Sequence, residues 1–420
     1  MDECLSSHSG CPGKPSAPPP TSLLDVAPRH GEAQMISLVQ TRDWPQRDFS
    51  KWATLSYSWG GDQPHKTTRQ TLSRHLGGIA LADMPQTIQD AVAVCRRLGI
   101  PYLWIDSLCI IQQDTEDLHH ELAQMPQIYQ SSLVTIYAAS SHAVTEGFLQ
   151  KRHLWYRKFP PIRLRAQGIA PGAVAAEFSS LILSESIRSD CTYQEMDSAR
   201  FLEPLDERAW AYQERMLSPR TLVYSSRELS WQCRSAVLRA GNERRWTWPY
   251  RFAKPCTPGQ ATPPWEDFVK EYSRCLLSEE PDKLTAMAAI AEFYQREHSK
   301  TYIAGLWKED LPLALCWLVS ANYVKARPEE YRAPSWSWAA IDGQVDLKPM
   351  NSFKGKAEIL EATTTPRSEV APLTGVTGGS MTVRGELVWT TLRINVHGAK
   401  EAIFARATVG SLGRDGRDLN

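Results

Sequence analysis

Two carboxylates, Asp106 and Glu121, are the residues best suited to chemistry. Asp106 belongs to a long apolar run, residues 102–111, which lies between a glycine and the polar residues QQD and predicts a buried strand. We expect Asp106 toward the carboxyl end of that strand, where parallel sheets bind ligands. An unpaired carboxylate would be costly there. Asp106 is therefore either a ligand contact or acid–base group, or it is held by a following loop or by an arginine such as Arg208.

Glu121 lies in the next predicted helix, inside its apolar arc between Met125 and Ile128. Partial desolvation should raise the pKa of this carboxyl group, which suits acid–base work or a hydrogen bond to a ribose hydroxyl. The alternative is a glutamate that flanks the apolar stripe and reaches solvent, the commoner fate of helix glutamates. Pro126 falls within the same helix, so we expect the helix to kink or end near Met125.

An aromatic-then-glycine turn follows the first strand, with Tyr57, Trp59, Gly60 and Gly61. Trp59 could stack on a planar ring, and the glycines could let the backbone approach a phosphate. Any tight turn would also use two glycines, so the pattern leaves both interpretations open.

Cysteine usage points away from metal and disulfide chemistry. Nine cysteines are scattered along the chain without a CxxC pair, which argues against a disulfide framework and a structural zinc site. We therefore expect no metal site, and a reducing, cytoplasmic compartment. Cys109 should be a small buried hydrophobe on the sheet face opposite Asp106. The sequence also lacks a phosphate-binding GxxxxGK[ST] loop, a GxGxxG dinucleotide fingerprint, HExxH and GxSxG.

The overall composition allows a large core and excludes some partners. Among 420 residues, 47 basic and 47 acidic side chains balance, so no global field favours nucleic acid or anionic lipid. The chain has no uninterrupted apolar run of about 18 residues, so we expect no membrane span.

Strands and helices are predicted to alternate over residues 52–139. Residues 52–59 read as a strand, Asp83 as the cap of a helix that ends at Gly99, and Asp114 as the cap of the helix carrying Glu121. Residues 133–139 give a third strand. This order predicts a parallel sheet flanked by helices.

The sequence divides into five expected regions. The Pro-, Ser- and Gly-rich residues 1–33 are expected to form a disordered tail. We expect the main α/β domain over 34–240, a linker or surface loop over 241–264, a helical extension over 265–345, and a tail with strand-like segments over 346–420.

Four passages, in their order and spacing, resemble the fungal heterokaryon incompatibility (HET) family. They are ATLSYSWG from residue 53, PQTIQDA from residue 85, LWIDSLCI from residue 103 with its QQD, and RAWAYQER from residue 208. The resemblance extends over roughly residues 35–345. In the last passage we expect Arg208 and Glu214 to form a salt bridge or to tie the helix to the sheet.

The resemblance implies a function in nonself recognition and programmed cell death. It also implies a core similar to the TIR and flavodoxin-like sheet. Some TIR proteins cleave NAD with a glutamate, so the resemblance makes NAD a candidate substrate, with no bound cofactor, and Glu121 the candidate catalytic residue. Fold likeness alone does not transfer an activity. The alternatives are a non-enzymatic module that signals by self-association or with a protein partner, and an enzyme of fungal secondary metabolism.

Overall fold

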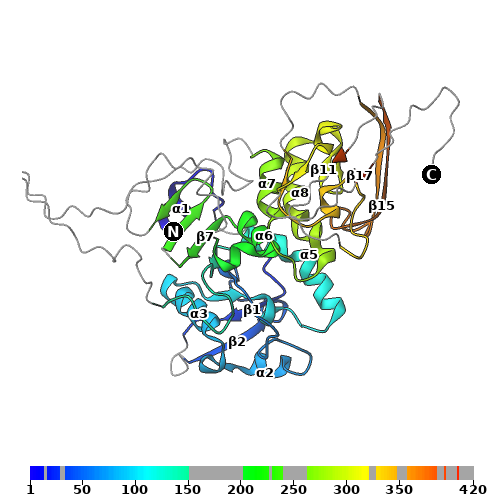
Figure 1. Ribbon diagram of the computed structural model, residues 1–420. Coiled ribbons are helices and arrows are strands. Elements are labelled where there is room, and N and C mark those ends of the chain that lie inside the picture. Colours follow the sequence, from blue (N-terminus) through cyan, green and yellow to red (C-terminus); the bar gives the residue numbers. More distant parts are fainter. Residues whose placement is uncertain are drawn as a thin grey trace, which may run out of the picture. The chain divides into compact units, whose positions relative to one another are not determined.

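The computed structural model describes the chain in ten segments (Figure 1): residues 1–13, 17–28, 34–150, 202–226, 229–239, 263–320, 328–347, 357–385, 392–393 and 404–405. The chain divides into two compact units. The first unit comprises Met1–Asp267 with Cys275–Ser278, and the second comprises Phe268–Arg274 with Glu279–Asn420. Nearly all of the expected linker over 241–264 lies outside the described residues.

The first unit is built on a nine-stranded mixed sheet with the order β4-β2-β1-β5-β3-β6-β7-β8-β9. Four neighbouring strands, β5, β3, β6 and β7, are parallel, and antiparallel strands extend the sheet on both sides. The α/β class is therefore confirmed, but the expectation of a parallel sheet holds only for these four strands. The strands are β1 (Ser22–Asp25), β2 (Met35–Gln40), β3 (Trp52–Ser56), β4 (Ile79–Ala80), β5 (Tyr102–Trp104), β6 (Val134–Tyr137), β7 (Arg220–Tyr224), β8 (Leu229–Cys233) and β9 (Val237–Arg239).

The strand order switches at β3, because the chain adds its next parallel strand first on one side of β3 and then on the other. The chain passes from β3 through α3 to β5 on one side, then through α4 and α5 to β6 on the other side of β3. Since parallel crossovers are right-handed, α3 and α5 cover opposite faces. Open α/β sheets bind ligands at the carboxyl ends of the strands at such a topological switch point. The helices of this unit are α1 (Asp2–Ser7), α2 (Leu72–Gly77), α3 (Gln86–Leu98), α4 (Asp106–Cys109), α5 (Thr115–Ser131) and α6 (Ala209–Leu217).

The ends of α3 and α5 follow local sequence signals with two exceptions. Gly99 ends α3 in the left-handed conformation, φ 68°, and Asp114 caps α5 by accepting a hydrogen bond from the backbone N–H of Asp117. The cap of α3 is Pro85, not the expected Asp83. Of the two outcomes expected near Met125, a kink or an end of the helix, the end does not occur.

Helix α5 instead continues past Pro126 to Ser131. Ile128 and Tyr129 lie beyond the proline and are buried, and the indole N–H of Trp52 donates to the carbonyl of Ile128. The packing of this last turn against β3 compensates for the hydrogen bond that the proline cannot make.

The expectation of a disordered N-terminal tail is wrong for the described part of it. Strand β1 lies inside the sheet, where it pairs antiparallel with both β2 and β5. Leu23, Leu24 and Val26 have no exposed surface. The few apolar residues of this segment stand together, so a short strand can bury them although the average composition is polar.

The buried run after Gly99 is shorter as a strand than expected. Strand β5 ends at Trp104, and the backbone then turns into α4, where the N–H of Cys109 donates to the carbonyl of Ile105 at 2.7 Å. Asp106 and Cys109 therefore lie on one helical turn and not on opposite faces of a strand. Cys109 is buried, as expected.

The second unit has mixed structure, which corrects the expectation of a helical extension. It holds two longer helices and several short antiparallel strand pairs. The β14–β15 hairpin joins two strands of nine residues each through eight residue pairs, with two irregularities in the register. The elements are α7 (Trp265–Ser273, whose first three residues belong to the first unit), α8 (Thr285–His298), β10 (Tyr302–Ile303), β11 (Leu306–Trp307), β12 (Leu318–Val319), β13 (Val345–Asp346), β14 (Glu358–Pro366), β15 (Val376–Arg384), β16 (Leu392–Arg393) and β17 (Phe404–Ala405).

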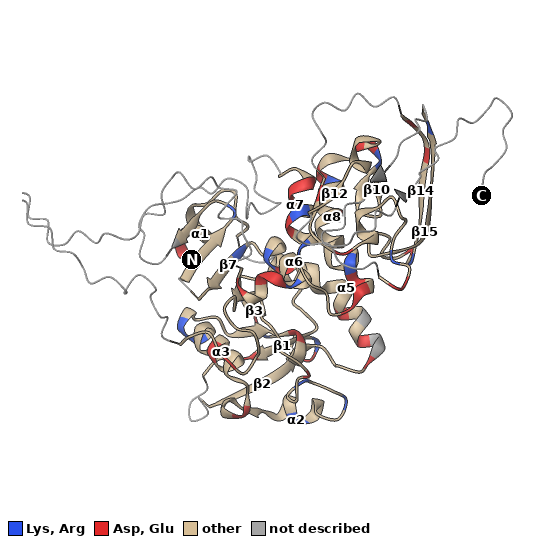
Figure 2. Ribbon diagram, in the orientation of Figure 1, with Lys and Arg blue, Asp and Glu red and all other residues tan. Residues whose placement is uncertain are grey.

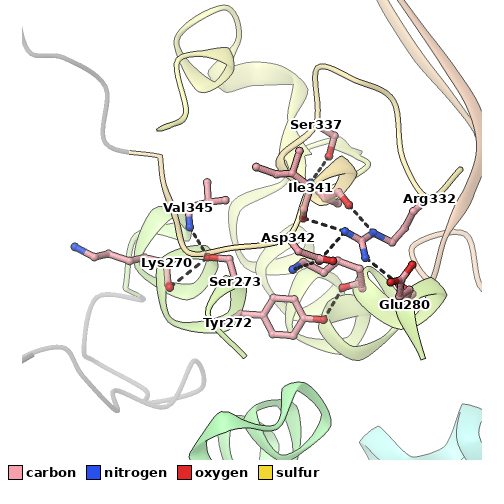
Figure 3. A network of polar contacts seen from close by, with 11 residues as sticks. Lys270, Tyr272, Ser273, Glu280, Arg332, Ser337, Ile341, Asp342 and Val345 are labelled. Atoms are coloured by element: carbon pink, nitrogen blue, oxygen red, sulfur yellow. Dashed lines mark hydrogen bonds and ion pairs between the residues drawn. The ribbon is translucent and has the colours of Figure 1, made fainter. Parts of the chain in front are cut away.

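A buried ion network stabilises the second unit (Figure 3). Arg332 donates to the carboxylate of Asp342 at 2.9 Å and to the backbone carbonyls of Glu280 and Ile341. Lys283 lies 3.4 Å from the same carboxylate. Burial alone would raise the pKa of Asp342, but Lys283 and Arg332 hold it below its usual value. The network is satisfied within the unit, which indicates a structural role.

Charged residues are rare in the strands of the nine-stranded sheet and frequent in the helices (Figure 2). This pattern agrees with a sheet covered on both faces. Among the described residues, no helix is long and apolar enough to cross a membrane.

Candidate functional site

Polar side chains gather at the carboxyl end of β3, where the order of the parallel strands switches from one side of β3 to the other. Strand β3 and the turn after it contribute Ser56, Tyr57 and Trp59, α4 contributes Asp106, and α6 contributes Glu214. Each of these residues ends or follows a parallel strand, or lies on a helix packed against one. The sheet topology therefore brings together residues that are up to 158 positions apart.

Asp106 is fixed by three neighbours. The indole N–H of Trp59 donates to Asp106 Oδ2 at 2.9 Å, and the backbone N–H of Ser107 donates to Oδ1 at 2.6 Å. The hydroxyl of Tyr57 donates to Ser107 Oγ at 2.8 Å. Burial raises the pKa of Asp106, while these donors and the positive charge of Arg208 oppose that rise. The expectation that Arg208 pairs with Asp106 holds as an electrostatic interaction.

Glu214 is the second carboxylate of this cluster. The hydroxyl of Ser56 donates to Glu214 Oε2. Burial, together with the nearby negative charge of Asp106, raises the pKa of Glu214 to about 7, although Ser56, Arg208 and Tyr129 oppose the rise. Two acidic groups held close together in a poorly solvated place titrate at separated pH values, which is the usual arrangement for proton transfer.

Several polar contacts hold Arg208 and helix α6 in place. Arg208 caps α6 and donates to the carbonyl of Tyr57 at 2.8 Å, which ties the helix to the turn after β3. One residue after Glu214, Arg215 pairs with Asp206 at 2.8 Å with little exposure on either side. The hydroxyl of Tyr137 donates to the same carboxylate at 3.0 Å. These contacts fix the position of Glu214, and Arg208 brings a positive charge next to both carboxylates.

Glu121 lies apart from this cluster. Its side chain is 1% exposed, and neither carboxylate oxygen has a hydrogen-bond partner among the described residues. Burial raises the pKa of Glu121, and the groups that act on it include Thr21, Asp117 and His120. The sequence therefore correctly placed Glu121 in a desolvated position, and no hydrogen bond joins it to Asp106 among the described residues.

Trp59 and Gly60 occupy different roles in the turn after β3. Trp59 is partly exposed and bonded to Asp106, so one face of its ring stays next to the candidate site. Gly60 has φ 73°, and a Cβ atom there would come within 2.2 Å of Ala143. Packing against the chain itself therefore explains Gly60, and a phosphate is not needed to account for it.

The four motif passages fall into two groups in space. The passage around Thr87 and Asp90 contacts the loop after β6: the backbone N–H groups of Phe148 and Leu149 donate to Asp90 Oδ2, and Gly147 N–H donates to Thr87 Oγ1. The role of this passage is therefore to fix the loop that follows β6. The other three passages supply the polar cluster.

Comparison with known families gives a match within the first unit. Residues 52–214 match the family model described as heterokaryon incompatibility protein (HET). This match supports the expected HET domain family over that segment of the chain. No curated protein and no solved structure matched the chain.

The cluster offers a base, an anion and a cation around one end of a strand. Glu214 can exchange a proton near neutral pH, Asp106 can stabilise a developing positive charge, and Arg208 can bind an anionic group. The sequence alone favours a structural role for Glu214. The motif RAWAYQER contains both Arg208 and Glu214, so the sequence did single out Glu214. Its position on a helix could not show whether the carboxylate only joins the helix to the sheet or belongs to a functional site.

Proposed function

We propose that this HET domain protein acts in fungal nonself recognition by triggering cell death from the cytoplasm, and that cleavage of NAD is the chemical step. The observation that carries the proposal is the pairing of Asp106 and Glu214 beside Arg208 at the carboxyl end of β3. The parallel strands run in the order β5-β3-β6-β7. This is the order of a flavodoxin-like sheet, which supports a TIR-like core.

The proposed reaction is hydrolysis of the bond between ribose and nicotinamide. The C1′–N bond breaks, nicotinamide leaves with the bonding electron pair, and a water oxygen bonds to C1′. Asp106 stabilises the positive charge that develops on the ribose, as one carboxylate does in glycoside hydrolysis. Glu214 accepts the proton of the attacking water and releases it to solvent, which yields ADP-ribose, nicotinamide and a proton.

The neighbours of the two carboxylates suit this substrate. Arg208 offers a positive charge for the pyrophosphate, and arginine is well matched to phosphate oxygens. The partly exposed ring of Trp59 can stack on a planar base. Because Glu214 titrates near pH 7, a reaction that uses it as a base should accelerate as the pH rises through about 7.

The test is release of nicotinamide from NAD by the purified full chain. We expect Glu214→Gln and Asp106→Asn to abolish release while the proteins remain folded by thermal melting. Glu121→Gln is the matched control, because it neutralises a buried carboxylate outside the cluster, and it should keep the activity. The proposal fails if folded Glu214→Gln releases nicotinamide at the parental rate, or if the parent leaves NAD intact.

Expression in a fungal host separates signalling from chemistry. If the parent and Glu214→Gln kill equally and NAD persists, the domain signals by assembly, and the enzymatic proposal is wrong. If only the parent kills and NAD falls before growth stops, the chemistry and the biological role are linked.

A further inference from the structure

Three cysteines and one histidine converge on the opposite side of the sheet's parallel core from β1 and β2. Cys4 lies in α1, His8 caps that helix, Cys11 follows in the next turn, and Cys233 ends β8. One ligand atom from each lies within 4.8 Å of every other. His8 Nδ1 lies 3.8 Å from Cys11 Sγ and 3.4 Å from Cys233 Sγ. Figure 1 shows α1 beside β7 in this part of the unit.

We propose that Cys4, His8, Cys11 and Cys233 bind one zinc ion, which fastens the N-terminal segment to the β8–β9 hairpin. A tetrahedral zinc ion with three sulfur ligands and one nitrogen ligand would separate neighbouring ligand atoms by about 3.6–3.8 Å. The distances of 3.8 and 3.4 Å from His8 Nδ1 to Cys11 Sγ and Cys233 Sγ are close to that geometry. Four protein ligands fill the coordination sphere, as in structural sites, and thiolates with imidazole favour zinc over harder metals.

The position of α1 supports this proposal independently. A helix of six residues is unstable by itself, and α1 buries only Cys4. The cluster around it consists of Cys4, Cys11 and Cys233 with Trp231 and Ala236 at its edge. This is little apolar surface to hold a chain terminus in place. Small elements without a core of their own are commonly held by a metal.

A buried arginine matches the charge that the bound metal would leave. Three thiolates and one imidazole around a divalent ion carry one net negative charge. Arg220, on β7, is 1% exposed and donates to Cys4 Sγ at 3.2 Å. It also donates to the carbonyls of Leu133 and Pro12. Ser235 Oγ lies 3.5 Å from Cys11 Sγ. Such outer contacts orient metal ligands and balance their charge.

The spacing of the ligands explains why the sequence did not reveal them. The first three follow as C-x3-H-x2-C near the terminus, without a CxxC pair, and the fourth comes 222 positions after Cys11. The expectation that the chain has no metal site rested on the absence of CxxC. Folding brings Cys233 to the other three because β8 is an outer strand of the same sheet that α1 packs against.

The experiment measures metal on the full chain, produced with zinc in the medium and purified with a non-histidine tag, a non-thiol reductant and no chelator. We expect about one zinc ion per chain by elemental analysis. Cys4→Ser and Cys233→Ser should each lower the zinc content about tenfold or more. Cys275→Ser is the matched control, because Cys275 has the same 7% exposure as Cys233 and lies outside the cluster.

Two further measurements remain informative if the serine variants fail to fold. Apoprotein of the unaltered chain should bind cobalt(II) with the thiolate charge-transfer and intense visible bands of a tetrahedral sulfur site. His8→Cys should keep the metal and strengthen the charge-transfer band. Absence of metal and of these bands from the folded parent would overturn the proposal. Full zinc content in folded Cys4→Ser, or a disulfide among the three cysteines in protein alkylated at lysis, would overturn it equally.

Discussion

Replacing Glu214 with glutamine tests the electrostatics of the candidate site without reference to any substrate. The pKa of this carboxyl group rises from 4.5 to about 7 in the folded chain, mainly through burial. The folded state therefore holds a proton on Glu214 between these values, whereas the unfolded state has lost it. The stability contributed by this group is complete below pH 4.5 and is lost as the pH rises through about 7.

The size of the effect follows from the shift. A shift from 4.5 to about 7 corresponds to about 3 kcal/mol, which is an upper limit for a partly exposed group. Glutamine resembles protonated glutamate in shape and does not ionise. Relative to the parent, Glu214→Gln should therefore become more stable as the pH rises from about 5 to about 8, by up to about 3 kcal/mol.

The assay is urea unfolding of both proteins at several pH values. Unfolding is monitored by hydrogen exchange in peptides from β3 and β6, because these peptides report on the first unit alone. Other titrating groups cancel in the difference between the two proteins. Ser56→Ala provides a second arm, because it removes a donor that lowers the pKa of Glu214. In that variant the loss of stability should move to higher pH. A constant difference between parent and Glu214→Gln over the whole range would refute the reasoning.

Three further substitutions or deletions test the fold by thermal melting. Ile105→Asp buries a charge without a partner at a position with no exposed surface, so it should cost more than about 4 kcal/mol and unfold the first unit; a soluble, cooperatively melting variant would contradict the placement of this residue. Deleting residues 1–28 removes β1 from inside the sheet and should cost about 5 kcal/mol or more; an unchanged melting temperature would mean that β1 does not contribute to the core. Gly60→Ala should destabilise by about 1–3 kcal/mol because of its positive φ and the contact with Ala143, whereas Gly77→Ala, which meets open space, should be neutral.

Much of the candidate site was accessible from the sequence because it depends on local signals. The carboxylate of Asp106 at the end of an apolar run predicted a polar group at the carboxyl edge of a sheet, and the structure places it there. Trp59, in the turn after the first strand, was also identified. The apolar arc of α5 correctly predicted that Glu121 is desolvated.

The choice between Glu121 and Glu214 could not be made from helical periodicity. Both carboxylates lie on amphipathic helices, and periodicity tells which face is buried but not which neighbours it meets. The answer depends on the crossover from β5 to β6, which directs the end of α5 toward β3, and on the pairing of β7 with β6, which brings α6 to Ser56.

The sequence by itself determined the α/β class, the first parallel strands, the end of α3 at Gly99 and the start of α5 at Asp114, because these depend on signals between residues close in the chain. Only the tertiary structure decided that β1 lies within the sheet, that α5 continues through Pro126, and that Asp106 stands beside Glu214. It likewise brought Cys233 to Cys4, His8 and Cys11. Each of these features depends on the free energy of contacts between distant segments, which outweighs local propensity where enough surface is buried or enough polar groups are paired.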